Sequence, residues 1–152
     1  MYKRRSVLKY FATIFLASPA VSANAATAGP LVKVYKSSTC SCCNKWVEHM
    51  RTAGFKVEAT NVADVGIYKL EYGVPRALGS CHTAIVDGYI VEGHVPADDV
   101  KKMLRQKPEI KGITAPGMPM GSPGMEGPNA VTYDVIAFDA DGNTSVFATH
   151  TP

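Results

Sequence analysis

Three of the four cysteines in this chain lie within one hexapeptide, Thr39-Cys40-Ser41-Cys42-Cys43-Asn44, and this crowding limits how the chain can fold. The fourth, Cys81, is followed directly by a histidine. Because Cys42 and Cys43 are adjacent and cannot easily pair with each other, two structural disulfides explain the spacing poorly. The segment therefore indicates a metal site or thiol redox chemistry, in a fold that can bring Cys81 to it.

Two overlapping spacings in the hexapeptide leave both kinds of chemistry open. Cys40 and Cys43 form a Cys-x-x-Cys, which is the spacing of redox dithiols. Cys40 and Cys42 form a Cys-x-Cys, which can converge on a soft metal, and thiolate and thioether ligands select Cu(I) among the available ions. A plain disulfide from Cys81 to Cys40 or Cys43 is a further alternative in an oxidising compartment.

The apolar pattern predicts an α/β fold of the thioredoxin-like kind. Alternation predicts strands and i+3/i+4 spacing predicts helices. Expected strands cover 31–35, 55–59, 83–86 and 89–92, expected helices cover 44–52, 63–72 and 96–106, and 131–138 with 144–149 form an added C-terminal β-hairpin. The order is βαβ and then ββα. The cysteines stand at the first strand-to-helix junction, where a helix N-terminus favours thiolate.

Cys81 lies at the start of the third predicted strand, a position that separates redox enzymes from metal sites. Thioredoxin-like enzymes typically carry a cis-proline there, and here Ser80-Cys81-His82-Thr83 places a fourth thiol facing the first three. His94 follows the predicted hairpin near the same edge of the sheet and is a candidate ligand. Strand alternation predicts that His82 points away from the site. We expect His49 and His150 to be solvated surface residues.

A Pro/Gly-rich stretch over 115–128 carries three methionines and excludes both helix and regular strand. Thioethers in such a loop, those of Met118, Met120 and Met125, cannot easily bury as core methionines do. Because a thioether binds Cu(I) without losing a proton, we expect at least one of them, with Met118 the candidate, to contact copper. The alternative is that the loop simply covers the site.

Residues 1–25 have the pattern of an export signal. Basic residues within 3–9 precede an apolar stretch over 11–21, which is too short to span a bilayer, and Ala23-Asn24-Ala25 supplies a cleavage pattern. The arginine pair also resembles the twin-arginine export motif, and an ordinary secretory signal is the alternative. We therefore expect an exported, periplasmic protein with a single metal-binding domain over 26–152.

Removing the signal changes the charge of the chain. The signal holds four of the 16 basic residues and none of the 13 acidic ones, which leaves twelve basic against thirteen acidic residues. No basic face for nucleic acid or for an anionic membrane is implied. The remaining chain, about 127 residues long, suits one domain with one modest core.

Several separated motifs carry a family resemblance. They are Cys40-Ser41-Cys42-Cys43, Lys45-Trp46-Val47, Ser80-Cys81-His82-Thr83-Ala84, Val86-Asp87-Gly88-Tyr89, Glu92-Gly93-His94-Val95-Pro96 and the stretch from Pro116 to Glu126. Together they resemble CopG-type proteins, which are exported bacterial copper-resistance proteins with a thioredoxin-like fold. The resemblance implies that the cysteine cluster binds several copper ions. It also implies a role in interconverting Cu(I) and Cu(II) during periplasmic copper handling.

The leading hypothesis is a periplasmic copper-binding protein for copper resistance, holding a thiolate-bridged, multinuclear Cu(I) cluster. The candidate metal ligands are Cys40, Cys42, Cys43, Cys81, His94 and Met118. Redox turnover of the copper would make the protein an oxidoreductase, and copper exporters, chaperones or oxidases of the periplasm are candidate partners. A thiol–disulfide oxidoreductase using Cys40 and Cys43 and a non-catalytic copper chaperone are the alternatives.

Overall fold

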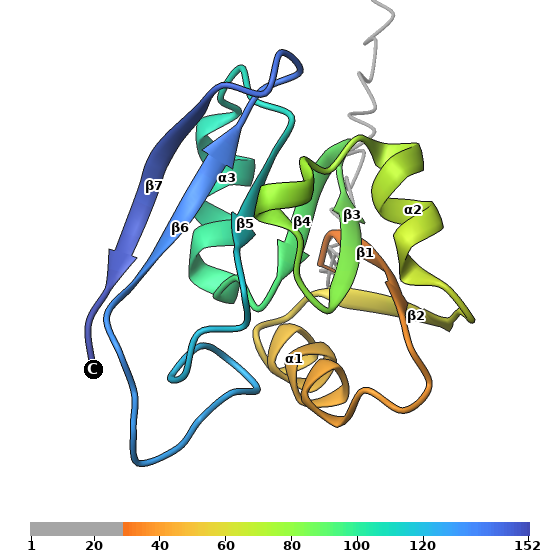
Figure 1. The fold of residues 1–152 in the computed structure, drawn as a ribbon, viewed down its shortest axis with the longest axis vertical. Coiled ribbons are helices and arrows are strands. Elements are labelled where there is room, and N and C mark those ends of the chain that lie inside the picture. The colour runs from red at the N-terminus through yellow and green to blue at the C-terminus, as the bar shows by residue number, and fades with distance from the viewer. Residues whose placement is uncertain (1–28) are drawn as a thin grey trace, which may run out of the picture.

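The computed structural model describes residues 29–152, which form a seven-stranded mixed sheet with three α-helices (Figure 1). The predicted mixed α/β class is confirmed. The predicted export signal over 1–25 and its cleavage site lie outside the described residues. Within the described part of the chain, no helix has the length and apolar character needed to cross a membrane.

The elements follow the predicted order closely. The strands are β1 (Leu31–Lys36), β2 (Lys56–Asn61), β3 (His82–Val86), β4 (Tyr89–Gly93), β5 (Gly112–Ala115), β6 (Tyr133–Phe138) and β7 (Thr144–His150). The helices are α1 (Ser41–Thr52), α2 (Val65–Tyr72) and α3 (Ala97–Gln106), with a short 3-10 helix, η1 (Arg76–Leu78). The added hairpin is β6–β7, which extends the sheet. Two features differ from prediction: α1 begins at Ser41 instead of residue 44, and β5 is a strand that the sequence does not predict.

The strand order β2-β1-β3-β4-β5-β6-β7 decides which loops meet. β1 is antiparallel to β3, β3 is antiparallel to β4, and β4 is parallel to β5. The carboxyl ends of β1, β4 and β5 and the amino end of β3 therefore share one end of the sheet. The cysteine segment after β1, Cys81 before β3, His94 after β4 and the methionine loop after β5 all gather there.

Helices cover both faces of the sheet. Val32 and Val34 of β1 belong to the main core, which also contains Trp46 and Met50 of α1 and Met103 of α3. Each of these apolar side chains contributes about 1.5–3 kcal/mol when fully buried. On the opposite face, the β1 tyrosine Tyr35 stacks on Tyr68 and Tyr72 of α2, at ring-centroid distances of 4.1 and 5.9 Å. The core under α1 and α3 thus supports the first turn of α1, where the cysteines lie.

Two histidines that were predicted to be solvated instead join elements together, so that prediction is wrong. His49 Nε2 accepts a hydrogen bond at 3.0 Å from the backbone N–H of Ala97, at the start of α3. Pro96, the N-cap residue of α3, provides no side-chain acceptor, and His49 takes over that role. His150 Nε2 lies 2.6 Å from Oδ2 of the buried Asp99, which ties β7 to α3.

Candidate metal centre

The cysteine segment forms the first turn of α1. Cys40 is the N-cap residue, and its Sγ accepts a hydrogen bond at 3.3 Å from the backbone N–H of Cys43. This cap explains why the helix begins three residues earlier than predicted. Cys43 is fully buried on the apolar face of α1, while Cys40 and Cys42 are partly exposed. The positive end of the helix dipole therefore lies next to the sulfurs of this first turn.

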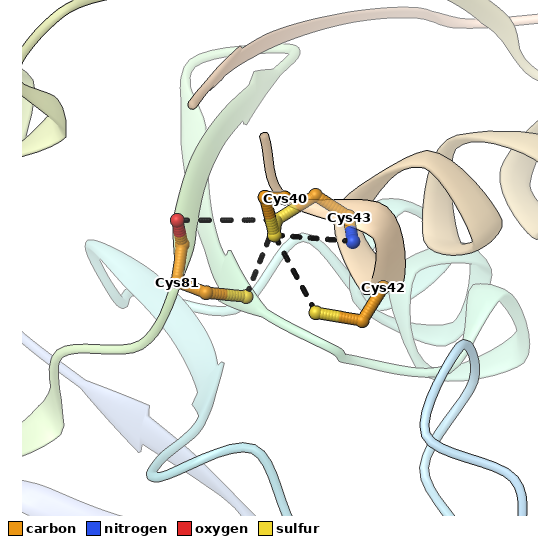
Figure 2. Close-up of side chains that lie close together, drawn as sticks. All are labelled: Cys40, Cys42, Cys43 and Cys81. Atoms are coloured by element: carbon orange, nitrogen blue, oxygen red, sulfur yellow. Dashed lines mark hydrogen bonds between the residues drawn. A yellow bond between two sulfur atoms is a disulfide. The ribbon is translucent and has the colours of Figure 1, made fainter. Parts of the chain in front are cut away.

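Cys40 and Cys43 are joined by a disulfide, with their Cα atoms 5.3 Å apart. Each sulfur of this disulfide has a free thiol 3.4 Å away: Cys42 Sγ lies beside Cys40 Sγ, and Cys81 Sγ lies beside Cys43 Sγ. Figure 2 shows the four side chains pointing toward one another from α1 and from the segment before β3. All four sulfurs lie within 4.8 Å of one another. The prediction that Cys81 faces the other three cysteines is confirmed, and the plain disulfide from Cys81 is not the pairing in the structure.

Cys81 reaches the cluster through an ordinary trans backbone. Residues 29–152 contain no cis peptide bond, in line with the absence of proline at this position. Burial raises the pKa of the Cys81 thiol to about 12, and the neighbouring Cys42 adds to the rise. The thiol is therefore protonated at neutral pH in the metal-free protein. A bound metal ion would reverse this preference, because metals bind the thiolate.

His94 is buried and is held between Cys81 and the methionine loop. Its Nε2 lies 2.9 Å from Cys81 Sγ, and its Nδ1 lies 2.7 Å from the carbonyl oxygen of Pro123. Because a carbonyl only accepts, Nδ1 carries the proton and Nε2 directs its lone pair at Cys81. Burial lowers the pKa of His94, which favours this neutral form. A histidine whose second nitrogen donates to a carbonyl is oriented as metal-binding histidines usually are.

His82 does not point away from the site, so that prediction is wrong. Its Nδ1 lies 3.4 Å from Cys81 Sγ, and its ring packs between Trp46 and His94 at centroid distances of 4.4 and 5.1 Å. Strand alternation fails here because Cys81 precedes the first residue of β3 and is not itself part of the strand. Donor atoms of Cys43, Cys81, His82 and His94 lie within 4.8 Å of one another.

The methionine loop, residues 115–128, touches the site through its backbone. The Pro123 carbonyl holds His94, and the next residue, Gly124, packs so closely that a Cβ there would lie 2.7 Å from the Cys42 carbonyl oxygen. Met118 is 39% exposed and has a left-handed backbone, with φ of 54°. A role for Met118 as a ligand stays a prediction. The backbone contact of Pro123 had no signal in the sequence, because every residue carries a carbonyl.

Comparisons with known proteins show which family the chain resembles. A family model described as "Protein of unknown function, DUF411" matches residues 78–125, which include Cys81 and His94. A solved structure described as "Copper resistance protein copG- Form 2" is 41% identical, covers 80% of this chain and 98% of its own, and has a TM-score of 0.76. A second, "Copper resistance protein copG- Form 1", matches with the same identity and coverage and a TM-score of 0.75. The search of curated proteins gives no match. With this identity over nearly the full length of those structures, the chain belongs to the CopG family of copper resistance proteins, as its motifs predicted.

Proposed function

We propose that this protein binds copper for copper resistance, and that the reduced forms of Cys40, Cys42, Cys43 and Cys81 hold a thiolate-bridged cluster of Cu(I) ions. The observation that carries the proposal is the convergence of four sulfurs within 4.8 Å at one end of the sheet. Soft sulfur ligands select Cu(I), and a thiolate with several lone pairs can bridge neighbouring ions. The copper-resistance names of the related structures support the same metal.

The donor atoms fit copper once the disulfide is opened. In the disulfide form only Cys42 and Cys81 are free thiols, and a dithiol reductant that transfers two electrons to the Cys40–Cys43 bond would release two more. His94 adds an imidazole nitrogen already directed at Cys81. Met118 of the methionine loop is proposed to complete the site with a thioether, which needs no deprotonation.

We place this chemistry in the periplasm, on the evidence of the signal pattern in residues 1–25. The βαβ order with cysteines at the first junction supports a thioredoxin-like description of the fold. Sulfur and imidazole donors together suit both Cu(I) and Cu(II), which supports a role in interconverting the two. Turnover in a Cu(II) reduction assay separates this oxidoreductase from a chaperone that only passes Cu(I) to exporters or oxidases.

The test is a copper count on the reduced protein. The chain is reduced under anaerobic conditions, freed of reductant, loaded with Cu(I) and passed through a desalting column before copper is measured. We expect several copper ions per chain and a clear loss in Cys81→Ser. Ser41→Ala is the matched control, because Ser41 lies in the same hexapeptide, is exposed and is expected to leave the count unchanged. At most one weakly held copper, unchanged in Cys81→Ser, would overturn the cluster.

A thiol–disulfide oxidoreductase is the second candidate, and the Cys40–Cys43 disulfide favours it. Cys40 is partly exposed and lies at a helix N-terminus, as the attacking cysteine of such enzymes does. The trans, non-proline residue at position 81 speaks against it. Reduction of a protein disulfide at a rate that survives Cys42→Ser and Cys81→Ser would favour this candidate over copper binding.

A further inference from the structure

Glu92 of β4 is a fully buried carboxylate on the sheet face that α2 covers. Its Oε1 accepts hydrogen bonds from the backbone N–H of Ser80, at 2.6 Å, and from Lys69 Nζ of α2. Its Oε2 accepts from Thr83 Oγ1 at 2.7 Å. A buried carboxylate is strongly disfavoured unless it is paired and hydrogen-bonded, and these donors meet that requirement.

The partners of Glu92 lie on both sides of Cys81. Thr83 follows the Cys81–His82 pair and stands opposite Glu92 in the β3–β4 register, so the sheet already aligns it. Ser80 precedes Cys81 and lies before β3 begins, outside the ladder of backbone hydrogen bonds. The carboxylate supplies the acceptor that a neighbouring strand would otherwise provide for the Ser80 amide. It therefore extends the fixed backbone up to the residue that carries the thiol.

Neighbouring residues fix the same segment at further points. Thr114 of β5 stands opposite Glu92 on the other side, and its Oγ1 donates to the carbonyl oxygen of Leu78 at 2.8 Å. Ser80 packs against Gly93, where a Cβ would lie only 2.4 Å from the Ser80 side chain. Residues 78–80 are thus held along β4 and β5 just before Cys81 enters the site.

Lys69, which is partly exposed, neutralises the negative charge of the Glu92 carboxylate. Its Nζ forms an ion pair with Glu92 and donates a hydrogen bond to Thr83 Oγ1 at 3.1 Å. The Lys69 side chain is 21% exposed. No residue of α2 is buried, and this ion pair joins the helix to a carboxylate that is fully buried in the sheet beneath it. The pair lets one anionic group remain in the interior beside the site.

We infer that Glu92 is a positioning residue for Cys81, holding the Ser80–Thr83 backbone so that the Cys81 sulfur stays within reach of Cys43 and His94. Where a thioredoxin-like enzyme presents a proline, this chain presents a thiol on a backbone held by a buried carboxylate. A change in Cu(I) affinity tests this inference only if the proposed function holds. The alkylation of Cys81 and the hydrogen exchange of the Ser80 amide test it independently of copper.

The test compares Glu92→Leu, which removes the acceptors, with Glu92→Gln, which keeps one oxygen for the Ser80 amide. In the reduced, metal-free protein, we expect Glu92→Leu to raise the rate of Cys81 alkylation about tenfold relative to that of Cys42, measured by peptide mass spectrometry. We also expect Cu(I) affinity, measured by competition with a chromogenic chelator, to fall about tenfold to a hundredfold, as losses of supporting contacts around metal ligands usually do. Glu92→Gln is expected to recover part of both effects.

Ile113→Ala is the matched control, because Ile113 is a buried residue of the main core whose apolar side chain makes no hydrogen bond to the Ser80 segment. It is expected to leave the ratio of Cys81 to Cys42 alkylation unchanged. A folded Glu92→Leu protein with the unaltered alkylation ratio and Cu(I) affinity overturns the inference.

A measurement on the unaltered protein covers the case in which Glu92→Leu does not fold. We expect the Ser80 amide hydrogen to exchange as slowly as the amides of β3, and exchange at the rate of an open loop overturns the inference. If the unaltered protein binds no copper, the proposed function fails, while the alkylation ratio and the Ser80 exchange still decide the role of Glu92.

Discussion

The cysteine site and the methionine loop meet at the same end of the sheet, yet they present their sulfur atoms in opposite ways. The four cysteines are fixed by the first turn of α1 and the start of β3, and their sulfurs converge within 4.8 Å. In the loop, Met118 is 39% exposed on a left-handed backbone. The difference shows that regular elements bring the four sulfurs of the cysteines together, whereas an irregular loop places the thioether of Met118 toward the surface.

The loop is nevertheless a defined structure. Its turns are closed by backbone hydrogen bonds, from Gly121 N–H to the Met125 carbonyl at 2.9 Å and from Val131 N–H to the Met120 carbonyl at 3.0 Å. It contacts the cysteine site through Pro123 and Gly124. The loop therefore holds His94 and packs against the first turn of α1.

Opening the Cys40–Cys43 disulfide is expected to have the largest effect. With the disulfide intact, two of the four sulfurs are covalently occupied, and we expect at most one copper ion per chain, against several after reduction. Copper is counted under anaerobic conditions, and alkylation followed by mass spectrometry counts the thiols. Only Cys42 and Cys81 should be labelled in the disulfide form, and all four cysteines after reduction. Equal copper uptake by both forms would show that Cys40 and Cys43 do not hold the copper.

Gly124→Ala is expected to damage the contact between the two regions. Its φ of 89° makes alanine unfavourable by about 1–2 kcal/mol, and the new Cβ would lie 2.7 Å from the Cys42 carbonyl oxygen and 3.2 Å from His94 Nδ1, which adds about 1–3 kcal/mol of overpacking. Gly117→Ala is the control, because Gly117 has a φ of 69° in the same loop and open space around it. Urea unfolding measures both variants. An equal loss of stability would mean that the loop does not press on the cysteine site.

Local signals were enough to predict most of the fold. Asp87 and Gly88 both adopt positive φ, of 48° and 83°, as a tight hairpin turn requires, and Asp-Gly is a pair typical of such turns. The helical spacing over residues 44–52 likewise predicted α1, although the helix begins at Ser41. The pairing of β3 with β4 and the position of α3 after Pro96 followed from such patterns.

Tertiary contacts decided what the sequence could not predict. β5 has only four residues, and its strand conformation comes from pairing with β4 and β6 on either side. His82 was misplaced because alternation does not extend to a residue before the strand, and His49 because its acceptor role depends on where α3 begins. The approach of Cys81 to the other cysteines and the position of His94 at the same end of the sheet were predicted. The packing of His82 against the site and the contact of the Pro123 carbonyl with His94 were not.

Met118→Leu tests whether the loop supplies a ligand or only a cover. Leucine has a similar volume, and Met118 is partly exposed, so the free energy of unfolding is expected to change by less than about 0.5 kcal/mol. Cu(I) affinity is expected to fall several-fold, as measured by chelator competition, because a thioether ligand is lost. Met120→Leu and Met125→Leu test the other two thioethers of the loop in the same way. Unchanged affinity in all three variants would leave the loop as a cover alone.

Glu126→Gln is expected to give the smallest effect, visible only in acid. The Glu126 carboxylate accepts a hydrogen bond at 2.7 Å from the Gly124 N–H, and this bond holds the pKa of Glu126 below its ordinary value of 4.5. Because the ionised form is favoured in the folded state, its contribution to stability is complete above pH 4.5 and is lost as the pH falls through the lowered pKa. Glutamine keeps an oxygen for the Gly124 N–H but does not titrate. Between pH 7 and pH 3, the free energy of unfolding measured in urea should therefore fall less in Glu126→Gln than in the unaltered protein. An identical fall in both proteins would mean that the Glu126 carboxylate does not stabilise the loop next to the cysteines.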